Sequence, residues 1–102
     1  MHIDNMGEFE GLVHDIKCPL LIFFVTRWTK NAIDWNIINQ YKKNINIISI
    51  DVGNIPELVT YHHLNITPSV VLYKDGYYKA RANGFSLPYI KELVQYYGDN
   101  NE

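Results

Sequence analysis

The spacing of apolar residues along the chain predicts its helices and strands. Residues 6–16 place Phe9, Leu12 and Ile16 at the three- and four-residue intervals of an amphipathic helix. Residues 19–25 then form the longest apolar run, Pro-Leu-Leu-Ile-Phe-Phe-Val. A strand that is apolar on both faces is typical of a parallel strand covered by helices on each side. We therefore predict that this run is the central strand of a sheet.

A second helix is predicted shortly after this strand. Ile33, Ile37 and Tyr41 recur at helical spacing, which predicts a helix from about Lys30 to Lys43 with Thr29 as its N-cap. The stretch between the two elements is then a turn from a buried strand into a helix. In α/β proteins such turns often hold functional sites, because helix N–H groups point outward there.

The remainder of the chain is predicted to form shorter elements. In order, the pattern predicts a strand at 45–50, a short helix from Pro56 to His63, strands at 70–73 and 77–82, and a helix after Ser86. Asp75-Gly76 between the last two strands indicates a tight hairpin turn, so these strands should be antiparallel. Residues 98–102 are predicted to be a frayed tail.

This order predicts an α/β protein with a mixed four- or five-stranded sheet flanked by helices on both faces. A right-handed crossover would make the strands on either side of residues 30–43 parallel, and the hairpin adds antiparallel strands. Residues 1–4 are the candidate for a fifth, very short edge strand. The sequence contains no repeat and no linker, so we expect one domain over residues 1–97.

Composition and charge narrow the class of partner. The 102 residues are 47% hydrophobic with a formal net charge of -2, which suits one modest core and is not typical of disorder. No cluster of Lys and Arg indicates a nucleic-acid surface. No apolar run approaches the ~20 residues that span a bilayer. The first residues show no signal-peptide pattern, which favours a cytoplasmic location. We expect neither a nucleic-acid nor a membrane partner.

Residues that hold metals are scarce. Cys18 is the only cysteine, which excludes an intramolecular disulfide and a metal site with several cysteines in one chain. His62 and His63 are neighbours on a predicted helix, where adjacent side chains diverge by about 100°. His2 and His14 are remote from them in sequence. We therefore expect no metal and no cofactor.

The order of elements, together with several short motifs, resembles the thioredoxin-like fold family over residues 1–97. The motifs are Phe9-Glu10-Gly11-Leu12-Val13, Pro19 to Phe24, Trp28, Ile50-Asp51, Pro56-Glu57-Leu58, Leu64 to Pro68, Lys74-Asp75-Gly76 and Gly84. This resemblance implies a thioredoxin fold with its active-site loop after the central strand. It also implies a cis peptide bond before Pro68, in a second loop that faces the first.

The chain departs from the family where the family carries its chemistry. The Cys-Gly-Pro-Cys quartet maps onto Thr29-Lys30-Asn31-Ala32, so both cysteines are missing. The family's buried carboxylate maps onto Phe23, and its strand lysine onto about Ile47. Thiol–disulfide exchange needs an attacking thiolate and a resolving thiol. Cys18 starts the central strand, about 25 Å from the loop at ~3.3 Å per residue, so it cannot replace them. We therefore expect no dithiol oxidoreductase activity.

Two residues of this degenerate loop allow more than one interpretation. We favour Thr29 as an N-cap; alternatively its hydroxyl contacts a ligand, with Arg27 and Lys30 helping to hold a carboxylate or phosphate. For Trp28 we favour half-buried packing; alternatively it is a platform beside a bound ligand. The sequence does not decide whether Trp35 is exposed or contacts a partner.

The motif that retains a use without thiols is Thr67-Pro68. A cis bond there would expose the Thr67 backbone, and an extended peptide could pair with it as an added strand. The predicted peptide-binding groove consists of Trp28, Ile66, Thr67, Pro68 and Gly84. We therefore predict a redox-inactive module that binds a protein or an extended peptide segment, with its oligomeric state open.

Two other functions remain open. One is a glutathione-linked or other enzyme that uses the same cleft, although the loop offers no nucleophile with a base beside it. The other is a structural subunit that binds through its sheet edge or through Tyr77, Tyr78, Tyr96 and Tyr97, since tyrosine is enriched at interfaces.

Overall fold

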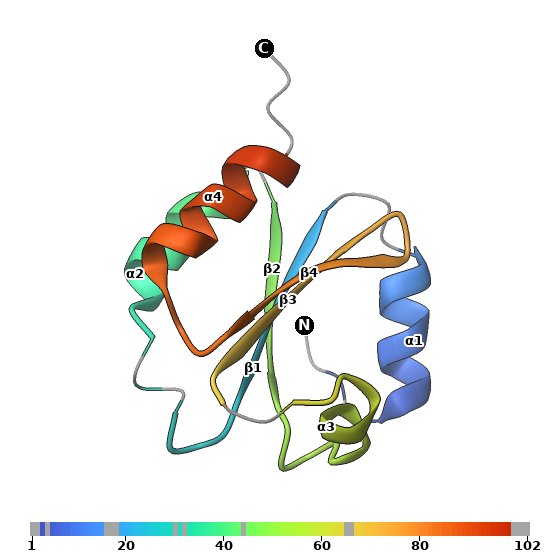
Figure 1. The fold of residues 1–102 in the computed structure, drawn as a ribbon. Helices are drawn as coiled ribbons and strands as arrows, with labels where there is room; N and C mark the ends of the chain where they lie inside the picture. Colours follow the sequence, from blue (N-terminus) through green and yellow to red (C-terminus); the bar gives the residue numbers. More distant parts are fainter. Residues whose placement is uncertain are drawn as a thin grey trace.

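The computed structural model describes residues 3, 5–15, 19–29, 31, 33–43, 45–64 and 67–98. Along the chain the elements are α1 (Met6–Asp15), β1 (Leu20–Val25), α2 (Trp35–Ile38), the 3-10 helix η2 (Asn39–Lys43), β2 (Asn46–Asp51), α3 (Glu57–Tyr61), β3 (Ser69–Lys74), β4 (Tyr77–Asn83) and α4 (Leu87–Tyr97). The strands lie at the centre, with α1 and α3 on one side and α2 and α4 on the other (Figure 1).

The four strands of the described residues form one mixed sheet in the order β2-β1-β3-β4. β1 pairs with β2 in parallel and with β3 antiparallel, and β3 pairs with β4 antiparallel. The predicted α/β class, mixed sheet and flanking helices are confirmed. Ile3 is buried, and the other residues of the predicted edge strand at 1–4 lie outside the described residues, as do tail residues 99–102.

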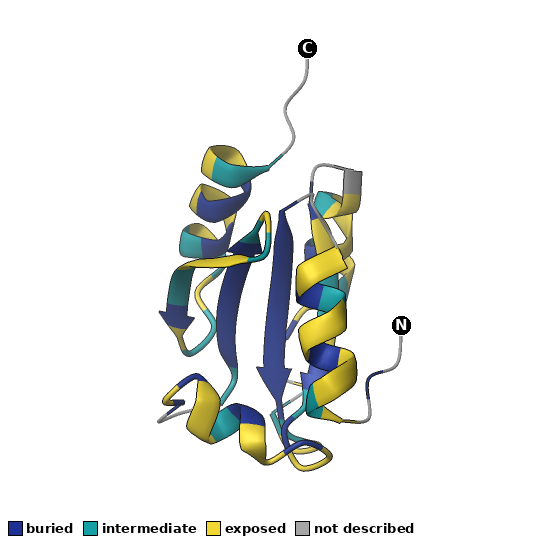
Figure 2. Ribbon diagram, turned by 90° about the vertical axis from the view of Figure 1, so that its right-hand side faces the viewer, coloured by how far each residue is buried: buried dark blue, intermediate teal, exposed yellow. Residues whose placement is uncertain are grey.

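The core consists of two layers separated by β1, every residue of which is buried. Leu20, Ile22 and Phe24 face the layer that contains α1 and α3. The alternate side chains face the layer that contains α2 and α4, where the ring of Phe23 meets the rings of Trp35 and Phe85. Figure 2 shows the buried strands β1 and β3 at the centre and the helices exposed on their outer sides. The prediction that residues 19–25 form a central strand covered by helices on both faces is confirmed.

Short polar contacts fix the ends of several elements. The Asn5 side-chain oxygen accepts the backbone N–H of Glu8 at 2.9 Å and thereby caps α1. Asp75 and Gly76 have φ values of 55° and 84°, the left-handed conformations that a two-residue hairpin turn requires. The predicted Asp-Gly hairpin and the antiparallel pairing of its strands are therefore confirmed.

The predicted helix at 30–43 is wrong in its first half. The α-helix begins only at Trp35 and continues from Asn39 as 3-10 helix. Its N-cap is Asp34, not Thr29: the Asp34 carboxylate accepts the N–H groups of Asn36 at 3.1 Å and Ile37 at 3.4 Å. A carboxylate at this position satisfies the free donors of the first turn and complements the positive end of the helix dipole. The α-helix therefore begins after Asp34 and not after Thr29.

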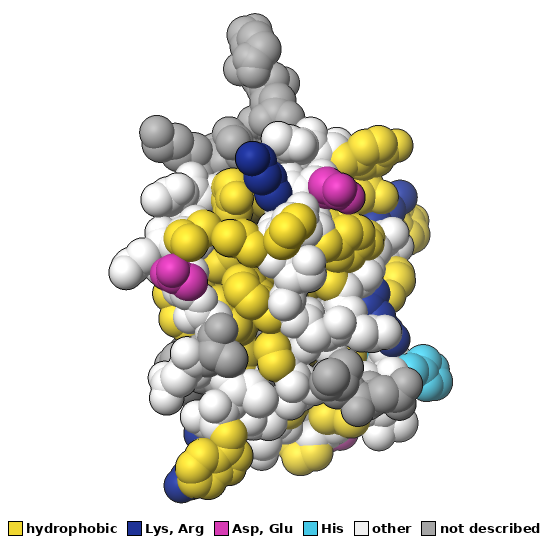
Figure 3. Space-filling view, turned by 60° about the vertical axis from the view of Figure 1, so that its left-hand side comes forward, with side chains coloured by type: hydrophobic (Ala, Val, Ile, Leu, Met, Phe, Trp, Pro, Cys, Tyr) yellow, Lys and Arg dark blue, Asp and Glu magenta, His cyan; other side chains and the backbone are white. Residues whose placement is uncertain are grey.

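The face covered by α2 and α4 keeps apolar side chains at its surface. Several residues packed over this core layer are only partly buried, among them Trp35, Tyr41, Phe85 and Tyr97. In Figure 3 apolar side chains gather in the middle of this face, interrupted by single charged residues.

Because the ring of Phe23 is completely buried, Phe23→Asp should lower the free energy of unfolding by about 3 kcal/mol or more. The substitution removes aromatic packing and buries a carboxylate without a partner. Phe23→Leu is the matched control and should cost clearly less, since its side chain remains apolar. Urea unfolding of both variants measures the difference. Equal stabilities would mean that this position is not in the core.

Candidate functional site

Strand register brings three predicted site segments to one end of the sheet. Phe24 of β1 lies opposite Ser69 of β3, which lies opposite Asn83 of β4. The turn that follows β1, the Thr67-Pro68 segment that precedes β3 and Gly84 after β4 therefore lie at the same end of the sheet. The turn after β1 is at the bottom left of Figure 1. We call the surface formed by Thr26–Thr29, Thr67, Pro68 and Gly84 the β1-end surface.

The turn after β1 is held by two threonine hydroxyl groups. The Thr29 hydroxyl accepts the backbone N–H of Thr26 at 2.8 Å and lies 3.1 Å from the Thr26 hydroxyl. The Thr26 hydroxyl in turn accepts the N–H groups of Trp28 at 3.2 Å and Thr29 at 3.1 Å. Three backbone N–H groups of this turn, those of Thr26, Trp28 and Thr29, are therefore bound within the turn. Thr29 therefore stabilises the turn through its hydroxyl group and is not the predicted N-cap of the helix.

Within the described part of the loop, this arrangement argues against the anion site considered above. Such a site needs free N–H groups at the start of a helix. The N–H groups of Trp28 and Thr29 are bound to Thr26, and the first donors of α2 are bound to the Asp34 carboxylate. Asn31 is exposed, whereas Lys30 and Ala32 lie outside the described residues.

Trp28 projects from this turn into solvent. Its side chain is 77% exposed, and the guanidinium carbon of Arg27 lies 4.8 Å from its ring centre. The favoured prediction of half-buried packing is therefore wrong. The hydroxyl groups of Thr26 and Thr29 accept the backbone N–H groups of the turn. The turn is therefore held without packing of the Trp28 indole beneath it. The exposed ring fits the other interpretation, a platform beside a ligand.

The other segments of the β1-end surface lie at the same end of the sheet as this turn. The Thr67–Pro68 peptide bond is cis, and both residues are partly exposed. Gly84 has a φ of 87°, and a Cβ atom built on it would meet nothing within 4 Å. The backbone at Gly84 is therefore open on its outer side. Ile66 of the predicted groove and the lone Cys18 lie outside the described residues.

A buried histidine on the α1 and α3 side is a feature that the sequence does not reveal. The side chain of His62 is 3% exposed. Its Nδ1 lies 3.1 Å from the carbonyl oxygen of Leu58, and its Nε2 lies 2.7 Å from the Tyr73 hydroxyl. A carbonyl only accepts, so Nδ1 carries the proton and the Tyr73 hydroxyl donates to Nε2. The ring also meets Phe9 and Phe24 edge-on or tilted.

Burial determines the protonation of both partners. Burial lowers the pKa of His62 below its ordinary value, and the charges of Arg81 and His63 lower it further, against the opposing effect of the bond to Leu58. Burial also raises the pKa of the Tyr73 hydroxyl, with smaller effects from Tyr61 and Tyr78. The pair is therefore neutral at pH 7. Both His62 nitrogens are engaged, and no group of three metal ligands gathers among the described residues.

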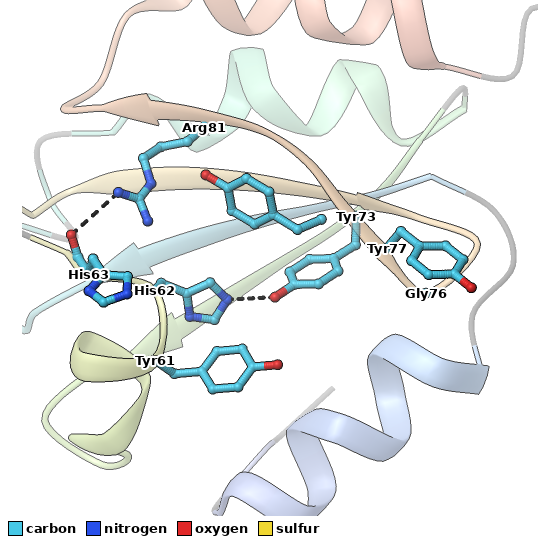
Figure 4. A pocket seen from close by; sticks show the side chains of 8 residues that line it. Tyr61, His62, His63, Tyr73, Gly76, Tyr77 and Arg81 are labelled. Carbon is cyan, nitrogen blue, oxygen red and sulfur yellow. Dashed lines mark hydrogen bonds between the residues drawn. The ribbon is translucent and has the colours of Figure 1, made fainter.

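A pocket of about 510 Å³ lies between α3 and the β3–β4 hairpin. Its walls are mainly aromatic and include the buried His62 and Tyr73, with Arg81 on one side (Figure 4). The sequence suggests Tyr77 and Tyr78 only as part of an interface surface, and no sequence spacing relates them to α3. The pocket and the β1-end surface are separate features of the fold.

Comparisons with solved structures identify the fold. The chain is similar to thioredoxin from Plasmodium falciparum (TM-score 0.79, 19% identity, covering 93% of this chain and 96% of that one). It is also similar to thioredoxin of Schistosoma mansoni, with a TM-score of 0.82 and 16% identity, covering 93% of this chain and 94% of that one. A cysteine-to-serine mutant of Entamoeba histolytica thioredoxin is similar with a TM-score of 0.78 and 24% identity, covering 94% of this chain and 97% of that one. No protein-family model and no curated protein matches the sequence.

The chain therefore has a thioredoxin-like fold, as its motifs predict. At these identities the similarity shows the fold alone. The sequence holds one cysteine, so the pair of cysteines of a Cys-X-X-Cys motif is absent. None of the described helices is long and apolar enough to cross a membrane.

The buried neutral His62 should make stability depend on pH. Its pKa is lowered from 6.5 in the folded chain, so the unfolded chain binds the proton more readily. The stabilisation is present above pH 6.5 and is lost as the pH falls toward the lowered pKa. Urea unfolding between about pH 7 and pH 5 should therefore show falling stability.

His62→Gln should flatten this dependence, whereas the matched control His63→Gln should keep most of it, because His63 is exposed and its charge is the smallest contribution to the lowered pKa of His62. A dependence that is unchanged in His62→Gln would contradict the assignment of the pH effect to the buried ring.

Proposed function

We propose that this chain is a redox-inactive binding domain that takes up an extended segment of a partner protein at the β1-end surface. The observation that carries this proposal is the exposure of Trp28 at the tip of a turn that Thr26 and Thr29 lock from within. A large aromatic side chain held in solvent by an ordered turn has little structural use there. At protein interfaces, tryptophan is enriched among the residues that dominate binding energy.

The chemistry of the loop supports the absence of redox activity. Thr29 replaces the attacking cysteine, and its hydroxyl is engaged with Thr26 on two sides. A threonine nucleophile needs a base beside it. The carboxylate that follows in this segment, that of Asp34, is engaged as the cap of α2. The glutathione-linked or other enzyme is therefore the weaker alternative.

The surroundings of Trp28 suit a peptide. The β1–β3 ladder ends at Phe24 and Ser69, so Thr67 lies beyond the paired part of the sheet. An extended segment can add its backbone to such an end, while its side chains lie across the indole. The open side of Gly84 leaves room for a second chain. Arg27, stacked on Trp28, adds a positive charge at the rim.

Because both cysteines of the quartet are missing, the purified protein should not reduce insulin disulfides above the rate of a blank without protein. Cys18→Ser should leave that result unchanged. Insulin precipitation measures the rate, with an active thioredoxin as the positive control. Turnover that is abolished by Cys18→Ser would contradict redox inactivity and indicate an intermolecular mechanism with one thiol.

Trp28→Ala should reduce partner binding by roughly tenfold or more, as expected for a central aromatic contact. Tyr96→Ala is the matched control, since Tyr96 is 81% exposed on the distant α4. The immobilised chain is used to capture partners from native lysate, and the amount that each variant retains is compared. Equal retention by Trp28→Ala together with loss in Tyr96→Ala would favour a tyrosine surface instead.

A further inference from the structure

The pocket beside the β3–β4 hairpin brings together residues from three elements. Tyr61 ends α3, Tyr73 lies on β3, and Tyr77 and Tyr78 begin β4. Gly76, in the turn of the hairpin, lies close to the end of α1, since a Cβ atom built on Gly76 would lie 3.8 Å from the Val13 carbonyl oxygen. The volume of the pocket, about 510 Å³, is in the range that small-molecule sites occupy.

Aromatic rings form most of the wall and differ in exposure. Tyr61, Tyr77 and Tyr78 are 54%, 69% and 47% exposed, whereas Tyr73 and His62 are buried. Tyr73 and Tyr78 meet edge-on at 6.0 Å between ring centres. The floor is therefore fixed by the bond between His62 and Tyr73, and exposed rings stand at the rim (Figure 4). Such walls suit a flat apolar ring, because aromatic pairs attract edge-on or offset.

Arg81 gives the pocket its charge. Among the residues that line the pocket none is acidic, and the neutral His62 adds no charge. One terminal nitrogen of Arg81 donates to the His63 carbonyl oxygen at 3.3 Å. Its Nε is buried and has no hydrogen-bond partner within the described part of the chain. A buried donor without an acceptor costs free energy. A carboxylate or phosphate is the kind of acceptor that the guanidinium of Arg81 would bind through such a donor.

The bond to His63 engages one terminal nitrogen of the guanidinium, while the edge that carries the buried Nε makes no hydrogen bond among the described residues. That edge carries Nε and the second terminal nitrogen, the fork that binds a carboxylate or phosphate through two parallel bonds. Tyr78 lies beside it, with its ring centre 5.9 Å from the guanidinium carbon. For an anion to reach the buried Nε a neighbouring side chain must move, and Tyr78 is the half-exposed neighbour on the edge strand β4.

We propose that this pocket binds a small molecule in which an aromatic ring carries a carboxylate or phosphate group. The ring lies among Tyr61, Tyr73 and Tyr77, and the anion binds the guanidinium of Arg81. A cation is disfavoured by the charge of Arg81 and the lack of acidic residues in the wall. A free inorganic anion would leave most of the aromatic wall unused. The site does not involve Trp28, so the proposal is independent of the function proposed above.

The experiment titrates the intact chain with phenyl phosphate and phenylacetate and follows amide chemical shifts by NMR. Benzyl alcohol tests the ring without charge, and inorganic phosphate tests the charge without a ring. We expect Kd values below about 1 mM for the two aromatic anions, with shifts at residues 61–63 and 76–81. We expect at least tenfold weaker binding for both reference compounds. Equal binding of benzyl alcohol or of inorganic phosphate would overturn the proposal, as would no binding of either aromatic anion.

Variants assign the binding to the pocket. Arg81→Gln should weaken phenyl phosphate roughly tenfold or more, because the charged fork is lost. Lys91→Gln removes the same charge from exposed α4 and should change Kd by less than about twofold. Arg81→Lys keeps the charge without the fork and should lie between them. Circular dichroism checks that each variant folds. Unchanged binding in both Arg81 variants would overturn the proposal.

The aryl anion could also belong to a peptide. Free phosphotyrosine and the same residue within a short peptide separate the two sources. We expect the free amino acid to bind at least as tightly as the peptide. Peptide binding that is tenfold tighter would replace the small molecule with a protein segment. Tyr61→Ala should weaken phenyl phosphate, and Tyr96→Ala, on the other side of the sheet, should not.

Discussion

The complete burial of β1 on both faces is the constraint on which the rest of the structure depends. Six consecutive apolar side chains cannot be shielded by one layer, so helices must cover both sides. Leu20, Ile22 and Phe24 require α1 and α3, and the alternate side chains require α2 and α4. The parallel partner β2 and the antiparallel partner β3 then satisfy the backbone of β1 on both edges. Where the apolar run ends at Val25, the chain must leave the core, and that exit is the turn that carries Trp28.

The fold could be predicted from the sequence because its signals are strong and local. The apolar run at 19–25, the Asp75-Gly76 turn and the stripe of the last helix each have one structural solution. The start of α2 could not, because Thr29 and Asp34 are both good caps five residues apart. The choice between them depends on the bonds that Thr26 makes to Thr29, a contact that capping rules do not consider.

The candidate site could be predicted only in outline. The motifs align Trp28, Thr67, Pro68 and Gly84 with the corresponding positions of the thioredoxin-like family. The strand pairing brings these segments to one end of the sheet. Side-chain direction was not predictable: Trp28 points to solvent although tryptophan favours packing, and His62 rather than His63 enters the core. Adjacent residues at the end of a five-residue helix carry no periodicity that separates them. The Arg81 pocket depends on contacts between segments 18 residues apart, which no local pattern encodes.

Binding of a partner at the β1-end surface can be tested by hydrogen exchange of the chain, alone and in complex with a partner captured from lysate. We expect slower exchange at residues 26–29, 67 and 83–84 in the complex, with α4 unchanged. Protection confined to α4 or to the tyrosines of the β3–β4 hairpin, with residues 26–29 unchanged, would contradict binding at this surface.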